Sequence, residues 1–99
     1  MTDEISQKRN LRAQVHGRVQ GVGYRQFVLY HAARLELTGW VRNNRFDHSL
    51  VELEAEGTKS RLENLLDLLY TGPTPARVRE INIDWSDFTG TYHGFEVRY

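Results

Sequence analysis

The hydrophobic pattern of this chain changes its period within one segment, Gly17-Arg18-Val19-Gln20-Gly21-Val22-Gly23-Tyr24-Arg25. Before this segment apolar and polar residues alternate, with Leu11, Ala13 and Val15 on one face, which is the pattern of a half-buried strand. After it the apolar residues recur at helical spacing, at Tyr24, Phe27, Val28, Ala32 and Leu35. The segment therefore predicts a strand that passes through a glycine-rich turn into the N-terminus of a helix.

A turn of this composition can bind an anion. Glycine tolerates positive φ, so the backbone N–H groups can fold inward, and the first-turn N–H groups of the helix have no intrahelical partner. Arg25 lies in that first turn and can add a planar, two-pronged donor. The same pattern also fits glycines that only turn the chain and a solvated Arg25. Its glycine spacing matches neither a Walker A loop nor the dinucleotide fingerprint.

Length and composition limit the class of protein. The chain has 99 residues, enough for one domain with a modest core, and we expect a polar, partly disordered tail over 1–10 and the domain over 11–99. No apolar run reaches membrane-spanning length, and no secretory segment follows Met1. The absence of cysteine excludes disulfides, a thiol nucleophile and the usual structural zinc sites. These features fit a cytoplasmic protein.

Charge is balanced overall but unevenly placed. Lys+Arg and Asp+Glu both number 13, which argues against binding to nucleic acid mainly by net charge. Residues 1–50 hold eight basic and four acidic residues, whereas residues 51–99 hold five and nine. The glycine-rich turn lies in the basic half, so the local charge favours a small anionic ligand.

Further patterns predict the remaining elements. The first helix should run over 24–36, and Gly39 should mark a turn before a strand that begins at 40–43. A polar hairpin then leads to a strand over 51–56, whose glutamates 52, 54 and 56 form a solvated face rather than a metal site. Thr58 caps a second, leucine-striped helix that Gly72-Pro73 ends. Alternation predicts two more strands, over 81–85 and 95–99.

The order of these elements predicts the fold. A β-α-β-β-α-β order with an added C-terminal strand, and a right-handed crossover, indicates an α+β ferredoxin-like split βαβ sandwich. Both helices then cover one face of a mixed, mainly antiparallel sheet. The strand over 40–43 runs parallel to the first strand, so its end places Asn43 near Arg25. Asn44 is an alternative amide, but strand alternation turns it to the opposite face.

Two segments in this order resemble motifs of the acylphosphatase family. Residues 17–25 resemble G-x-V-Q-G-V-x-[FY]-R, and Gly39-Trp40-Val41-Arg42-Asn43 resembles G-[FWY]-V-[KR]-N. The resemblance continues through Gly72-Pro73, Ala76-Arg77-Val78 and Phe95-Glu96-Val97-Arg98-Tyr99, and so covers 11–99. The chain departs from the family over Asn44–Leu50, which replaces a short Asp-Gly turn with a longer turn that lacks glycine.

The resemblance implies hydrolysis of the carboxyl–phosphate bond of small acyl phosphates to a carboxylate and inorganic phosphate, without metal or cofactor. By motif position Arg25 binds the phosphate and Asn43 orients the attacking water. The loop amides would surround the phosphate oxygens; they belong to Gln20, Gly21, Val22, Gly23 and Tyr24. Since no carboxylate or histidine is placed as a general base, we expect the substrate itself to accept the proton.

Two other classes of function remain open from the sequence. One is a non-catalytic phosphate- or carbamoyl-phosphate-binding module, since similar domains occur within larger hydrogenase-maturation enzymes. The other is a nucleic-acid-binding domain, which needs basic and aromatic residues on the open sheet face; the glutamate row opposes it. We expect a monomer whose partners are a small acyl phosphate and inorganic phosphate, as product and inhibitor, with no nucleic acid and no membrane. The four histidines are expected to be structural or solvated.

Overall fold

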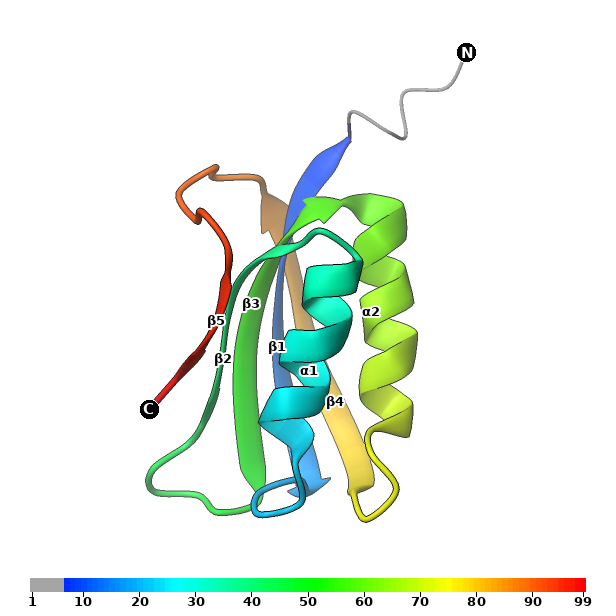
Figure 1. Cartoon of the computed structure of the whole chain (residues 1–99), viewed down its shortest axis with the longest axis vertical. Helices are drawn as coiled ribbons and strands as arrows, with labels where there is room; N and C mark the ends of the chain where they lie inside the picture. Colours follow the sequence, from blue (N-terminus) through cyan, green and yellow to red (C-terminus); the bar gives the residue numbers. More distant parts are fainter. Residues whose placement is uncertain (1–6) are drawn as a thin grey trace.

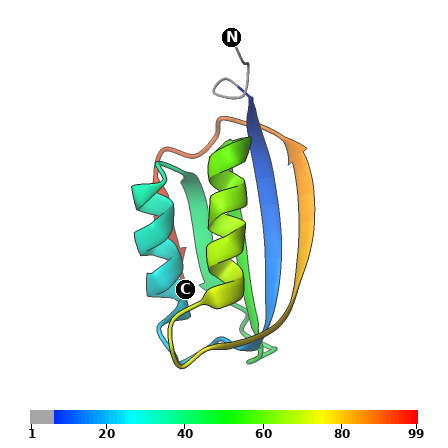
Figure 2. The same cartoon turned by 90° about the vertical axis from the view of Figure 1, so that its right-hand side faces the viewer.

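A five-stranded sheet carries two helices on one of its faces in the computed structural model, which describes residues 7–99 (Figure 1, Figure 2). In chain order the elements are β1 Lys8–Arg18, α1 Tyr24–Arg34, β2 Thr38–Asn43, β3 Leu50–Thr58, α2 Lys59–Thr71, β4 Arg77–Asp87 and β5 Phe95–Arg98. The predicted α+β fold, with its added C-terminal strand and both helices on one face, is confirmed.

The order of the strands brings three strand ends together. The sheet runs β4-β1-β3-β2-β5, and every neighbouring pair is antiparallel except β2 and β5, which are parallel. β1, β2 and β5 therefore point the same way, and the turn after β1 lies near the connection from β2 to β3 (Figure 1). We call this the site end of the sheet. The connection from β4 to β5 lies at the opposite end.

Apolar residues of the sheet and both helices form the core. The strands contribute Leu11, Ala13, Val15, Val41, Val51, Leu53 and Ala55, as their alternation predicts. The helices add Tyr24, Val28, Ala32, Leu62, Leu65 and Leu69. The hydroxyl of Tyr24 donates a 2.6 Å hydrogen bond to the carbonyl of Leu69, which joins α1 to α2, and burial raises the pKa of this tyrosine. Within residues 7–99 no helix is long and apolar enough to cross a membrane.

The start of the first strand and the end of the first helix differ from their predicted boundaries. β1 begins at Lys8, so residues 8–10 belong to the sheet; the rest of the tail expected over 1–10, up to residue 6, lies outside the described residues. α1 ends at Arg34 rather than near 36, because Glu36 takes a left-handed φ of 58°. The N–H of Leu37 then donates to the carbonyl of Ala32 at 2.9 Å, a Schellman-type closure that does not use glycine.

Gly39 does not form the predicted turn; it lies within β2. Its φ is 139°, and a Cβ atom at this position would collide with the backbone carbonyl oxygen of Glu54. The glycine is therefore required by the close approach of β2 and β3. The predicted cap and stop of α2 are confirmed, since the Thr58 hydroxyl accepts from the N–H of Arg61 and the helix ends at Thr71 before Gly72.

The predicted solvated acidic face is wrong for two of its three glutamates. Glu54 is 4% exposed and Glu56 is 1% exposed, whereas Glu52 is only partly buried. The side-chain amide of Asn10 donates to both buried carboxylates, at 2.7 Å in each case. The β4–β5 connection closes over them, and its backbone supplies further donors from Thr89 and Gly90. The alternating pattern of β3 could not predict this burial, because the connection that covers the two glutamates is distant in sequence.

Candidate active site

The glycine-rich turn has the backbone conformation that an anion-binding loop needs. Gly21 and Gly23 take left-handed φ values of 72° and 82°. A Cβ at either position would meet nothing within 4 Å, so backbone conformation rather than lack of space favours glycine here. Gly23 is the N-cap residue of α1 and provides no side-chain hydrogen bond to the helix. The first-turn N–H groups of α1 are therefore left to a ligand or to water.

A small hollow of about 80 Å³ joins this turn to the end of β2. Its walls come from Val19, Gly21, Gly23, Tyr24, Arg25, Gln26 and Asn43. The structure thus brings together Arg25 and Asn43, the two residues that carry the predicted roles. Of the other residues named for the loop, Gln20 lies at a neighbouring hollow and Val22 packs against the core.

The neighbouring hollow, of about 240 Å³, shares Arg25 and Asn43 with the first. Gln20, Asn44, Arg45, His48, Arg98 and Tyr99 complete its lining. The whole lining includes three arginines, Arg25, Arg45 and Arg98, and none of the lining residues has an acidic side chain. The joined hollows therefore form a positively charged site, which suits a small anion.

The sequence analysis missed four residues of this hollow: Arg45, His48, Arg98 and Tyr99. The last two arrive because β5 pairs in parallel with β2, with Arg98 opposite Arg42. A parallel partner carries its C-terminal end to the same edge of the sheet as Asn43. Arg98 and Tyr99 could have been predicted from the sequence if the fifth strand had been placed beside the second. No sequence pattern indicates that the exposed His48 lies at this hollow.

Arg25 is held without being neutralised. Its guanidinium carbon lies 5.0 Å from the centre of the Tyr99 ring, a cation–π contact. Within residues 7–99 no carboxylate forms an ion pair with this arginine. The full positive charge is therefore available to a ligand.

The two neighbouring asparagines at the end of β2 have different surroundings. The side-chain oxygen of Asn44 accepts hydrogen bonds from the N–H groups of Phe46 and Asp47, both at 2.8 Å. The side-chain oxygen of Asn43 is buried and has no hydrogen-bond partner within the described chain. An unpaired buried polar atom costs roughly 1–3 kcal/mol, so such atoms are rare and often mark functional sites. Both residues line the larger hollow, but only the Asn43 amide oxygen is uncommitted.

Hydrogen bonds order the long β2–β3 connection. Asp47 accepts from both the N–H and the hydroxyl of Ser49, and these bonds lower the pKa of Asp47. The side chain of Gln20 reaches across from the glycine-rich turn and donates to three backbone carbonyls of the connection. The departure from the family pattern is thus a defined loop rather than an open one.

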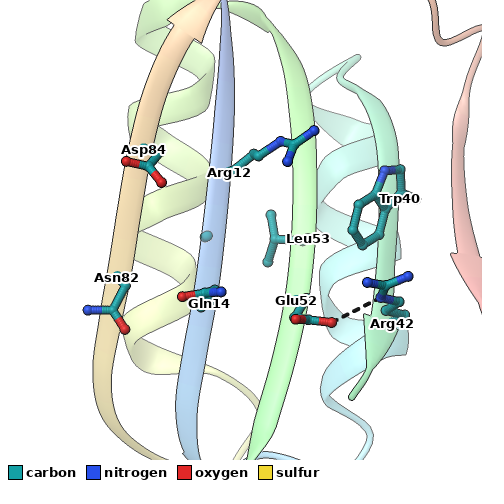
Figure 3. A pocket seen from close by; sticks show the side chains of 9 residues that line it. Arg12, Gln14, Trp40, Arg42, Glu52, Leu53, Asn82 and Asp84 are labelled. Carbon is teal, nitrogen blue, oxygen red and sulfur yellow. Dashed lines mark hydrogen bonds and ion pairs between the residues drawn. The ribbon is translucent and has the colours of Figure 1, made fainter. Parts of the chain in front are cut away.

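A separate depression of about 220 Å³ lies on the helix-free face of the sheet (Figure 3). Arg42 pairs there with Glu52 at 3.0 Å, as Figure 3 shows. Arg12, which also lines the depression, pairs with Glu54 at 3.3 Å. The depression contains neither Arg25 nor Asn43. Between residues 7 and 99 no three histidine or acidic side chains gather in a way that could hold a metal ion.

The fold and this site define a small α+β domain in which a glycine-rich turn, an arginine and a buried amide without a hydrogen-bond partner in the described chain line one hollow. The chain belongs to the acylphosphatase family, whose model matches residues 11–97. A relative from Salinibacter ruber named acylphosphatase is 44% identical over 95 residues, which cover 96% of this chain and 98% of the relative.

Solved structures agree with this assignment. The crystal structure of acylphosphatase from Bacillus subtilis is 35% identical, with a TM-score of 0.86, and the match covers 92% of this chain and 99% of that one. Full-length HypF, solved in a phosphate- and nucleotide-bound form, is 28% identical with a TM-score of 0.84. That match covers 94% of this chain but only 12% of HypF.

Proposed function

We propose that this protein hydrolyses the carboxyl–phosphate bond of small acyl phosphates, with Arg25 binding the phosphate and Asn43 holding the attacking water. One observation carries the proposal. Within residues 7–99, an arginine that has no carboxylate partner and a buried amide oxygen that has no hydrogen-bond partner line the same hollow, beside a left-handed glycine turn. Membership of the acylphosphatase family supports the same reaction.

The phosphate occupies the smaller hollow. Backbone N–H groups between Gln20 and Tyr24 surround its oxygens, and the guanidinium of Arg25 provides two parallel donors. Phosphoryl transfer depends mainly on positioning and on stabilising charge, and this arrangement supplies both. The acyl group extends into the larger hollow, whose outer wall includes Arg45 and Tyr99.

The Asn43 amide binds the water that attacks phosphorus. The attacking water donates a hydrogen bond through one O–H to the amide oxygen and presents a lone pair to the phosphorus. As the new O–P bond forms, the old O–P bond breaks and the carboxylate leaves with its electrons. The water then loses the proton of its other O–H. The proton passes to a phosphate oxygen of the substrate, because the site offers no carboxylate side chain as a base. An acyl phosphate has a good leaving group and needs no strong general acid. Neither metal nor cofactor takes part.

Two alternatives receive less support. A non-catalytic binding module would resemble the small part of HypF that matches, yet the chain also spans nearly the full length of a relative named acylphosphatase. Nucleic-acid binding needs free cations on the open sheet face, but Arg12 and Arg42 pair there with glutamates. We therefore propose a monomeric, cytoplasmic enzyme that binds neither nucleic acid nor membrane.

Turnover of a model acyl phosphate tests the proposal directly. We expect the purified chain to release phosphate from benzoyl phosphate at an unchanged rate with excess chelator, and inorganic phosphate to inhibit competitively. Loss of activity with chelator and its return with Mg²⁺ would contradict the metal-free mechanism. Binding of phosphate without any turnover would favour the non-catalytic module instead.

A further inference from the structure

We infer that the side chain of Gln20 is a positioning residue, which holds Asn43 in place through the β2–β3 connection. This inference rests on the proposed function of Asn43. Gln20 contributes a backbone amide to the proposed phosphate loop, but its side chain lies against the neighbouring connection. That side chain therefore links the segment that binds phosphate to the segment that carries the water-holding amide.

The contacts of the Gln20 amide are unusually concentrated. Its nitrogen donates to the carbonyls of Leu50 at 2.8 Å, Asn44 at 3.0 Å and Asp47 at 3.1 Å. These carbonyls belong to the first residue of the connection, a central residue and the first residue of β3. A side-chain amide has two N–H groups, so three acceptors saturate it. The nitrogen has no donor left for a phosphate oxygen.

The connection depends on such bonds because its side chains bury little apolar surface. Phe46 is 91% exposed, and the residues from Asn44 to Ser49 include no buried side chain. Few backbone hydrogen bonds cross the connection; one runs from the N–H of Asn44 to the carbonyl of Leu50 at 3.0 Å. The N–H of Gly17 adds one more tie from β1, to the carbonyl of Ser49 at 2.9 Å. Gln20 alone gathers three carbonyls, including both ends of the loop.

Asn43 immediately precedes this loop, so movement of the loop displaces its amide. A misplacement of about 1 Å at a reacting group costs roughly 10²-fold in rate. Removal of the Gln20 donors should displace the loop by less than about 1 Å and leave the glycine-rich turn in place. The effect should therefore appear in kcat, and binding of phosphate should be spared.

The test uses Gln20→Met, which keeps the length of the side chain but removes its donors. We expect kcat for benzoyl phosphate to fall about tenfold, while the inhibition constant for phosphate changes less than about twofold. Gln20→Glu should fall at least as far, because a carboxylate facing three carbonyls cannot donate. Gln14→Met is the matched control; this glutamine is exposed on the helix-free face and should keep wild-type kcat.

A double-mutant cycle separates positioning from direct binding. If Gln20 acts through Asn43, adding Gln20→Met to Asn43→Ala should cause little further loss. Losses that multiply in the double variant, or a raised phosphate inhibition constant with unchanged kcat, would show that Gln20 contacts the substrate and would overturn the inference. Wild-type kcat in Gln20→Met would overturn it too.

Hydrogen exchange keeps the inference testable apart from catalysis. The N–H groups of Asn44 and Leu50 should exchange faster in Gln20→Met than in the wild type, even if Asn43→Ala proves fully active and the proposed water role fails. Unchanged exchange would overturn the inference. Should Gln20→Met fail to fold, Gln20→Asn keeps a donor on a shorter side chain, and the same two measurements apply with a smaller expected loss.

Discussion

The two ends of the sheet treat their charged and polar groups in opposite ways. At the site end, Arg25 has no carboxylate partner within residues 7–99, and the side-chain oxygen of Asn43 is buried without a partner. At the opposite end, the carboxylates of Glu54 and Glu56 are almost fully buried, yet their oxygens accept hydrogen bonds from several groups of the chain. Figure 1 shows how far these two ends lie apart along the same strands.

Hydrogen bonding explains how the buried acids remain charged. Burial raises the pKa of Glu54, but bonds donated by Asn10 and Tyr92, with the nearby Arg12, more than offset it and lower that pKa overall. Burial likewise raises the pKa of Glu56, and donors from Asn10, Thr89 and Gly90 again reverse the shift. Among the described residues at this end, the Asn10 side-chain oxygen is the one buried polar side-chain atom without a partner, since the Asn10 nitrogen must face both carboxylates.

The contrast separates stability from function within one small domain. Satisfied charges at one end fasten the β4–β5 connection and so place β5 beside β2. Unsatisfied groups at the other end cost stability and stay available to a ligand. Variants at the site end should therefore change turnover more than stability, and variants at the opposite end should do the reverse.

The largest expected effect is on turnover in Arg25→Ala. Removing one preorganised donor to the developing charge costs roughly 10²–10³ in kcat, about 2.7–4 kcal/mol, while the fold should persist because Arg25 lies outside the core. Arg25→Lys should also be poor, because an ammonium lacks the two-pronged geometry. Steady-state kinetics with a thermal melt measure both properties. Near-wild-type turnover in a folded Arg25→Ala would remove the arginine from the mechanism.

The next effect distinguishes the neighbouring amides of β2. Asn43→Ala should lower kcat roughly 10²-fold with little change in phosphate affinity, since in the proposed mechanism this amide holds only the water. Asn44→Ala loses two exposed hydrogen bonds within the loop and should cost less than about tenfold. Kinetics of the two single variants decide the matter. An inactive Asn44→Ala beside an active Asn43→Ala would mean that the two roles are exchanged.

The fold could be predicted from the sequence because its signals are local. Alternation before Gly17, helical spacing after Tyr24 and the stop at Gly72 each describe neighbouring residues. The end of α1 was missed because Glu36, not a glycine, takes the left-handed position there. The burial of Glu54 and Glu56 was missed because a distant connection supplies their donors, and no period in the strand records it.

The part of the candidate site that follows from the order of the elements could also be predicted. Arg25 and Asn43 meet because strand direction fixes which ends of β1 and β2 share an edge, and direction follows from element order. Arg98 and Tyr99 depended on which edge of the sheet β5 joins, which alternation does not specify. The hydrogen bonds of the Gln20 side chain could not be predicted, because they depend on the shape of a loop that departs from the family pattern.

At the opposite end, Glu56→Ala should lower stability with little effect on kcat at temperatures where the variant is folded. The substitution leaves donors of Asn10, Thr89 and Gly90 without their acceptor. An orphaned buried donor costs roughly 1–3 kcal/mol and the loop donors regain water, so we expect a total of about 2–4 kcal/mol. Urea unfolding measures it, with Glu80→Ala on exposed β4 as the control, expected within about 0.5 kcal/mol. An unchanged urea midpoint in Glu56→Ala would show that the β4–β5 connection does not need Glu56 for its stability.

The smallest effect compares carboxylates whose pKa values are lowered at both ends. Glu56 is buried, whereas Asp47 is exposed and owes its lowered pKa to hydrogen bonds from Ser49. A lowered pKa in the folded state means that the unfolded chain binds more protons, so the free energy of unfolding rises with pH in this range. For Glu56 the gain should be fully present above its ordinary pKa of 4.5 and disappear as pH falls through its lowered folded value.

Glu56→Gln should therefore flatten the dependence of urea midpoints on pH as the pH falls below the ordinary glutamate pKa of 4.5. Asp47→Asn should leave most of that slope, because water screens an exposed charge and the hydrogen bonds around it contribute little net energy. The two variants are matched in chemistry, since each replaces a carboxylate with its amide, and they differ in burial. If Asp47→Asn removed the larger part of the slope, the site end would contribute acid-sensitive stability, and the division between a stabilising end and a functional end would fail.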